Sequence, residues 1–188
     1  MAVDLSPIVE LTDERFSQLC AANRDLRLER TAAGELVVVP PTGGQSSRRN
    51  ARITSQLLVW ADKDRTGVVF DSNGGFKLPN GAIRAPDASW VRLAAWQKLT
   101  DEEKEKFLPL CPDFVIELRS LTDSISDVQN KMEEYLDNGA QLGWLIDPQE
   151  RVVYIYRQQA QTETLDNPQT LAGDPVLAGF VLDLQEIW

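Results

Sequence analysis

The stretch Asp113-Phe-Val-Ile-Glu-Leu118 decides the fold class of this chain of 188 residues. A short, mostly apolar run of this kind is typical of a strand in the interior of a sheet. Apolar residues then recur at helical spacing, which predicts a helix that is capped by Thr122 or Asp123 and continues to about Asn138. The apolar run at 142–146 predicts the next strand. This order of strand, helix and strand indicates an α/β fold.

The N-terminal part of the chain is expected to contain two helices and a hairpin. Residues 12–23 and 46–64 carry apolar side chains at helical spacing, which predicts a helix in each segment. Residues 26–30 and 35–39 are β-prone runs on either side of Ala33-Gly34, a turn signal, and they predict a hairpin.

Shorter elements account for most of the remaining chain. Asn-Gly and Gly-Gly turn signals separate four β-prone pieces, which predict a meander of strands at 68–70, 76–78, 82–85 and 88–91. Two short helical pieces split near Thr100 are expected within 93–106. The C-terminal third is expected to add strands at 152–157, 162–165 and 180–184.

The length and the hydropathy of the chain limit the number of domains and the membrane segments that it can contain. A chain of 188 residues is long enough for one α/β core and short for two, so we expect a single domain over residues 1–188. The apolar runs are far shorter than the roughly 20 residues that a membrane helix needs. The N-terminus has no basic region followed by an apolar core, so no signal peptide is indicated and a cytoplasmic protein is expected.

The composition excludes several kinds of chemistry. The chain has no histidine, which excludes catalytic triads, imidazole bases and zinc sites that use this residue. Its two cysteines, Cys20 and Cys111, form no CxxC pair, so a disulfide framework or a thiolate zinc site is not indicated. The formal net charge of −10 argues against loose, non-specific binding of nucleic acid. Any chemistry must therefore use carboxylates, Lys, Arg, Tyr or hydroxyl groups.

Glu117 is the unusual residue of the quoted stretch. A carboxylate in an interior strand costs several kcal/mol unless a cation or hydrogen bonds compensate it. Because side chains alternate along a strand, Glu117 and Arg119 are expected to project from the same face. The compensating partner of Glu117 is either a bound metal or a structural ion pair with Arg119 or Lys131, and the sequence leaves both readings open.

Two more charged residues lie beside apolar elements. Asp87 follows Pro86 and opens the apolar run Ala88-Ser-Trp-Val91, although Pro-Asp also commonly just begins a strand. Lys131 borders the inward stripe of its helix, from which its ammonium could reach the strand ends or simply leave its stem over apolar surface. Two carboxylates and a cation suit Mg²⁺ or Mn²⁺, ions that can activate water for phosphodiester hydrolysis.

These residues resemble a known pattern. Pro86-Asp87 followed by Glu117-Leu118-Arg119 is similar to the PD-(D/E)XK nuclease motif, with Arg119 where the superfamily usually has lysine. The sequence around this motif resembles the putative restriction endonuclease family that is common in cyanobacteria. That resemblance covers nearly the whole chain and includes the segments Pro41-Thr-Gly-Gly44, Lys131-Met-Glu-Glu-Tyr135 and Gly143-Trp-Leu-Ile-Asp-Pro148.

The resemblance implies a restriction-endonuclease-like core, in which helices flank a mixed sheet. It implies that Asp87 and Glu117 hold the metal and that Lys131 is the motif lysine, moved onto the helix. Glu29 on the first hairpin matches an early acidic residue of the family and is a further candidate metal ligand. Arg119 does not deprotonate and cannot act as a base, so it is expected to bind phosphate or to pair with Glu117.

The favoured interpretation is an endonuclease in which water on Mg²⁺ or Mn²⁺, held by Asp87 and Glu117, attacks the phosphorus of DNA with help from Lys131. A non-cleaving protein that binds nucleic acid or protein is the first alternative. A structural partner protein with an exposed aromatic tail is the second. A homodimer is expected because nucleases that cut both strands often have two-fold symmetry.

Overall fold

The strand around Glu117 lies in the middle of a six-stranded sheet in the computed structural model, which describes residues 2–188. This strand, β8 (Phe114–Leu118), is antiparallel to β7 (Ala88–Arg92) and parallel to β9 (Leu142–Asp147). The strand order is β11-β10-β9-β8-β7-β4. The outer strands are β4 (Gly67–Asp71), β10 (Val152–Arg157) and β11 (Glu163–Asp166). Parallel and antiparallel pairs therefore occur together, which confirms the mixed sheet.

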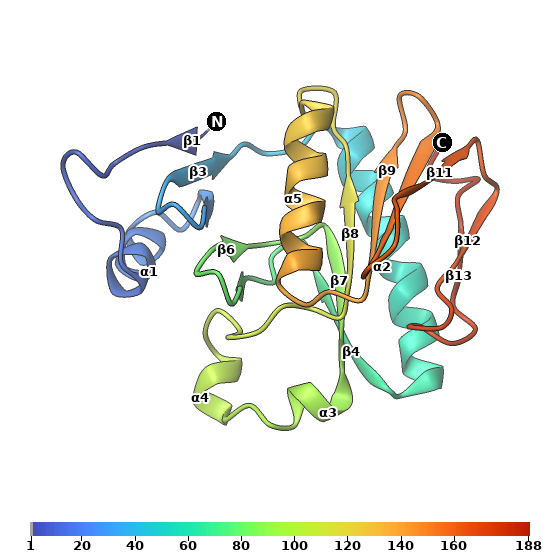
Figure 1. Cartoon of the computed structure of the whole chain (residues 1–188), viewed down its shortest axis with the longest axis horizontal. Coiled ribbons are helices and arrows are strands. Elements are labelled where there is room, and N and C mark those ends of the chain that lie inside the picture. Colours follow the sequence, from blue (N-terminus) through green and yellow to red (C-terminus); the bar gives the residue numbers. More distant parts are fainter. Residues whose placement is uncertain (1) are drawn as a thin grey trace.

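Two helices cover the two faces of this sheet, with α5 (Ile125–Asp137) in front of it and α2 (Gly44–Asp64) behind it in Figure 1. Ile116 packs in one apolar cluster with residues of α2, whereas Val115 packs in another with Met132 and Tyr135 of α5. Side chains alternate along β8, so Glu117 projects toward α5. Because a helix covers each face of the sheet, the side chains of β8 are mostly apolar on both faces.

A second sheet lies beside the first, with the strand order β1-β3-β2-β6-β5. Its strands are β1 (Ala2–Val3), β2 (Arg27–Arg30), β3 (Leu36–Val39), β5 (Phe76–Lys77) and β6 (Ile83–Arg84). Helix α1 (Asp13–Ala22) packs against it through Phe16, which is fully buried. The predicted hairpin is confirmed as β2 and β3.

The predicted meander is wrong in its connectivity. β4 and β7 pair with each other in the central sheet, while β5 and β6 form a hairpin that joins the second sheet. Turn signals mark where a strand ends, but they do not specify which edge the next strand pairs with. The β5–β6 hairpin places Arg84 beside β2, next to the predicted site.

The remaining elements follow the expected order with small shifts. The two helical pieces are α3 (Leu93–Trp96) and α4 (Asp101–Lys104), and Thr100 caps the second through a capping box. Helix α5 starts after Ser124 instead of Thr122 or Asp123, because the side chain of Asp123 accepts a hydrogen bond from the Ser120 amide. Both cysteines are free thiols. None of the helices in the described part of the chain is long and apolar enough to cross a membrane.

The C-terminal segment is not the exposed aromatic tail of the second alternative. β12 (Thr170–Ala172) and β13 (Val181–Asp183) form a small sheet, and Phe180 and Ile187 are buried in the main core. Arg48 and Arg49 of α2 donate to main-chain oxygens of this segment, and Arg52 pairs with Glu186. These arginines therefore hold the C-terminus and do not line the cleft described next.

Candidate active site

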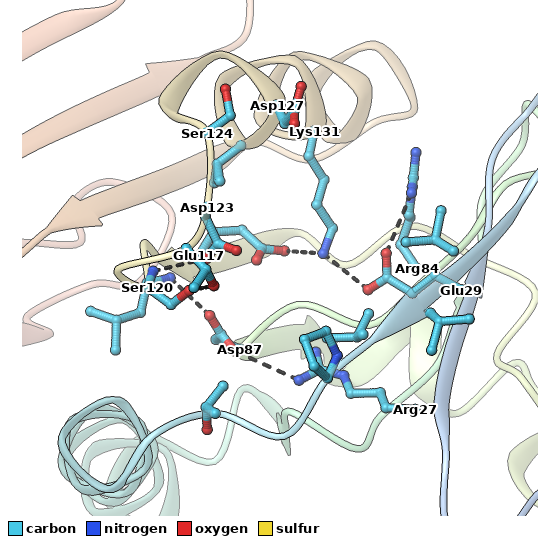
Figure 2. Close-up of a pocket in the computed structure, with 18 of the residues that line it drawn as sticks. Arg27, Glu29, Arg84, Asp87, Glu117, Ser120, Asp123, Ser124, Asp127 and Lys131 are labelled. Atoms are coloured by element: carbon cyan, nitrogen blue, oxygen red, sulfur yellow. Dashed lines mark hydrogen bonds and ion pairs between the residues drawn. The ribbon is translucent and has the colours of Figure 1, made fainter. Parts of the chain in front are cut away.

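A cleft of about 680 Å³ lies between the second sheet and the end of β8. Figure 2 shows that Asp87, Glu117, Lys131 and Glu29 all lie in this cleft, although they come from four different elements of the chain. The structure therefore brings together four of the five residues that the sequence singled out. Arg119 is not among the residues that line the cleft.

The register of β7 and β8 places the two predicted metal ligands side by side. The strands pair antiparallel up to Ala88 and Ile116, and Asp87 and Glu117 are the next residue on each strand. Beyond this point a side chain replaces the main chain as the acceptor: Asp87 Oδ2 accepts a hydrogen bond from the main-chain amide of Leu118 at 2.9 Å. Residues opposed in this way project from one face, so both carboxylates face the cleft.

The Asp87 carboxylate is held by contacts from three directions. Besides the Leu118 amide, Asn50 of α2 donates to Oδ1 at 3.0 Å, and a guanidinium nitrogen of Arg27 lies 3.9 Å from the same oxygen. Burial nevertheless raises the pKa of Asp87, because these contacts do not fully replace the lost water. Asp87 is thus fixed in position while its negative charge stays under-compensated.

Both protein contacts of Glu117 fall on the same carboxylate oxygen. Oε1 accepts from the Tyr135 hydroxyl at 3.0 Å and lies 2.9 Å from the Lys131 ammonium. No donor from residues 2–188 forms a hydrogen bond with Oε2. Burial raises the pKa of Glu117 to about 7, and the neighbouring charges of Asp87 and Glu29 act in the same direction.

Lys131 lies between two carboxylates, Glu117 and Glu29 (Figure 2). Its ammonium is 3.0 Å from Glu29 Oε1, and the side chain is 18% exposed. Burial acts to lower the pKa of Lys131, but the two carboxylates outweigh it and raise the pKa to about 12. Lys131 therefore carries a positive charge throughout the physiological pH range.

Glu29 uses both of its oxygens in contacts with the protein. Oε1 accepts from Lys131 and from the Ala85 amide, and Oε2 lies 3.3 Å from Arg84. Arg84 in turn binds Glu134 of α5 at 2.6 Å. This chain of ion pairs connects the second sheet to α5, and it makes Glu29 a partner of Lys131 in this structure.

Arg119 does not form the ion pair with Glu117 that the sequence predicted. Strand β8 ends at Leu118, so the alternation that would place Arg119 beside Glu117 stops one residue too early. The guanidinium instead binds Asp147 Oδ2 at 2.6 Å and the carbonyl oxygen of Asp123. The expected pair between Glu117 and Arg119 is wrong, and the alternative pair with Lys131 is the one observed.

Sequence reasoning did not assign Tyr135, Arg84 and Asn50 to the site. Tyr135 follows Lys131 by four residues, which is the spacing of neighbours on one helix face. The sequence could therefore have indicated that Tyr135 lies close to Lys131. No sequence pattern indicated Arg84 or Asn50, because Arg84 lies on the β5–β6 hairpin and Asn50 on the helix behind the sheet.

Replacing Tyr135 with phenylalanine is expected to lower the free energy of unfolding by about 1 kcal/mol, the usual net contribution of one hydrogen bond. The ring stays in the core, while Glu117 Oε1 keeps its ion pair with Lys131. Urea denaturation measures the change. Tyr154→Phe, a half-buried tyrosine of β10, is the matched control and should change stability less.

The donor set of the cleft fits a hard divalent cation. Residues 2–188 contain no cluster of three or more Asp, Glu, His or Cys side chains arranged around one metal. Two carboxylates on one face remain, Asp87 and Glu117, and Mg²⁺ commonly takes one or two carboxylates and keeps several waters. Beside them, the acceptor Asn50 Oδ1 is buried and receives no hydrogen bond from residues 2–188. Unpaired oxygens of this kind are what a hydrated cation would satisfy.

Comparison with known proteins identifies the family of the chain and a structure with a similar fold. Residues 13–185 match the model of the family Uma2, described as putative restriction endonuclease. The chain is also similar to a crystal structure of a putative nuclease belonging to DUF820 from Anabaena variabilis ATCC 29413. That match has a TM-score of 0.72 and 26% sequence identity, and it covers 85% of this chain and 88% of the other. No curated protein matches the chain. Because the family model spans most of its length, the chain belongs to the Uma2 family of putative restriction endonucleases.

Proposed function

We propose that this protein is a metal-dependent endonuclease that hydrolyses phosphodiester bonds of DNA. The observation that carries the proposal is the pair of buried carboxylates, Asp87 and Glu117, on one face of a cleft and beside the ammonium of Lys131. Membership of a restriction endonuclease family supports the same activity. Asp87 and Glu117 would hold Mg²⁺ or Mn²⁺, which supplies a bound water of lowered pKa and positive charge beside the phosphate.

The residues around the two carboxylates have distinct tasks in this proposal. Lys131 remains protonated, so it donates hydrogen bonds and positive charge to the phosphate or to the nucleophile and does not accept a proton. Glu29 and Tyr135 are positioning residues, because the first holds Lys131 and the second holds Glu117. Arg119 binds Asp147 and supports the strand end, away from the reacting atoms.

A cleavage assay tests the proposal directly. Labelled DNA incubated with the protein and Mg²⁺ or Mn²⁺ should be cut, and EDTA should stop the reaction. Asp87→Asn should be inactive, because the amide keeps the size of the side chain but removes its charge. Cleavage that is equal for the variant and the wild type would refute the assignment of the site.

A non-cleaving protein that binds nucleic acid or protein is the second candidate. One observation favours it, because the Lys131 ammonium already compensates Glu117 and Glu29 without a metal. The same assay separates the two, since this candidate predicts no metal-dependent product at any protein concentration. The homodimer also remains a prediction, and sedimentation equilibrium with and without DNA checks it.

The free energy of unfolding of the metal-free protein should fall as the pH rises from 4.5 to about 7. Because the pKa of Glu117 is raised in the folded state, the folded protein still binds a proton that the unfolded chain has released. At 1.36 kcal/mol per pKa unit, the loss is about 3 kcal/mol. The raised pKa of Asp87 adds to the same trend.

Urea denaturation in EDTA at a series of pH values measures this fall in stability. Glu117→Gln should show a smaller fall, because it removes the titrating group. Added Mg²⁺ should stabilise the wild type most above pH 7, where Glu117 is ionised and free to bind it. Stability that rises over the same pH range would contradict the prediction.

A further inference from the structure

We propose that the cleft takes one unpaired strand of DNA and discriminates against a duplex, an inference that rests on the proposed function. Three observations carry it: an apolar wall of the cleft, the size of the cleft, and a rim of carboxylates that form no ion pair within residues 2–188. The wall and the rim consist of residues that the hydrolytic chemistry does not use.

The apolar wall is formed by the face of the second sheet that looks into the cleft. Glu29 is directly opposite Val37, and Arg27 is directly opposite Val39. Opposed residues of antiparallel strands share a face, so both valines project into the cleft with Glu29 and Arg27. Pro40 and Pro41 continue the wall.

Val37 and Val39 have no role in the hydrophobic core. Their neighbours on the other face, Leu36 and Val38, pack against the cluster around Phe16, whereas neither Val37 nor Val39 belongs to a described core cluster. Both remain partly exposed. Two β-branched side chains thus line a polar cleft outside the core clusters of residues 2–188, and the flat apolar face of a nucleobase is a suitable partner for them.

A base can use this wall only if it is unpaired and unstacked. In a duplex, the faces of the bases are covered by their neighbours, and only the base edges are reached through the grooves. In a single strand, bases can be splayed out and packed against protein side chains. The cleft of about 680 Å³ is in the range of small-ligand pockets, which suits a nucleotide or two and not a double helix.

The rim of the cleft adds an electrostatic preference. Glu35, Asp123 and Asp127 line it, and none of them forms an ion pair within residues 2–188. The three cations of the cleft, Arg27, Arg84 and Lys131, are already engaged with carboxylates. A duplex carries about one phosphate per 1.7 Å of axis, twice the density of each of its strands, so the rim repels it more strongly.

Fluorescence anisotropy tests the preference without relying on catalysis. The probe is a labelled DNA oligonucleotide, single-stranded or annealed to its complement, with Ca²⁺ in place of Mg²⁺. We expect the single strand to bind at least about tenfold more tightly, which corresponds to roughly one good contact. Equal or tighter binding of the duplex would overturn the inference.

Three variants assign the preference to the wall and the rim. Val37→Ser and Val39→Ser should each weaken binding of the single strand by about three- to tenfold, the scale of one lost aliphatic contact. Asp127→Asn should increase duplex affinity more than single-strand affinity. Val181→Ser, which alters an exposed valine of β13 outside the cleft, is the matched control and should bind like the wild type. Val37→Ser and Val39→Ser that bind like the wild type would overturn the role of the wall.

The proposed function and this inference fail in different ways. Bis(p-nitrophenyl) phosphate carries a phosphodiester but no base, so its metal-dependent hydrolysis reports on the catalytic centre alone. If the wild type hydrolyses it and yet prefers duplex DNA, only the inference is refuted. If the wild type binds single strands preferentially but never hydrolyses a phosphodiester, the proposed function is refuted and the binding preference stands.

Discussion

Glu117→Gln is expected to reduce metal-dependent hydrolysis of DNA by on the order of 10³-fold, because a metal contributes several kcal/mol of transition-state stabilisation. Glutamine keeps the shape of the side chain and can still accept from Tyr135, but it loses the negative charge that would hold the cation. Initial rates with labelled DNA measure the loss. Isothermal titration with Mn²⁺ should show weaker binding by the same variant.

The control for Glu117→Gln is a glutamate outside the cleft. Glu163 on β11 pairs with Arg157 and does not line the site, so Glu163→Gln should cleave DNA like the wild type. The Glu117 variant should also be at least as stable as the wild type above neutral pH, because it removes a carboxylate whose burial is unfavourable there. Full activity of a folded Glu117→Gln protein would refute its role as a metal ligand.

Lys131→Met is expected to destabilise the metal-free protein by about 3–5 kcal/mol at neutral pH, as when one partner of a buried ion pair is removed. The variant leaves the carboxylates of Glu29 and Glu117, which are 3% and 7% exposed, without the cation between them. It should also abolish hydrolysis. Urea denaturation in EDTA measures the stability, and the loss should be smaller at low pH, where Glu117 is protonated.

Lys131→Arg tests whether the positive charge at this position accounts for its effect on stability, and Lys106→Met is the control at an exposed lysine. Lys131→Arg keeps a cation beside both carboxylates and should recover most of the stability. Lys106→Met removes an exposed lysine that pairs with Glu102, and it should change stability by less than about 0.5 kcal/mol. A Lys131→Met protein as stable as the wild type would show that the buried carboxylates are compensated by something other than Lys131.

The placement of Glu29 and Arg119 shows where sequence reasoning reached its limit. Glu29 was assigned from the resemblance to a family, and Arg119 from strand alternation together with the motif. Neither argument reports which partner a side chain finds. Glu29 pairs with Lys131 and with Arg84, and Arg84 lies on the β5–β6 hairpin. Arg119 pairs with Asp147 because β8 ends one residue before it.

The sequence by itself determined the interior strand, the helix after it and the need of Glu117 for a cation. These are local properties: apolar periodicity fixes the element, and alternation fixes the face on which a side chain lies. Only the tertiary structure decided that Lys131 is the cation paired with Glu117, that Asp87 lies beside Glu117, and that Val37 and Val39 line the same cleft. Strand pairing between distant segments sets these contacts, and the energy of such pairing depends on the whole fold and not on neighbouring residues.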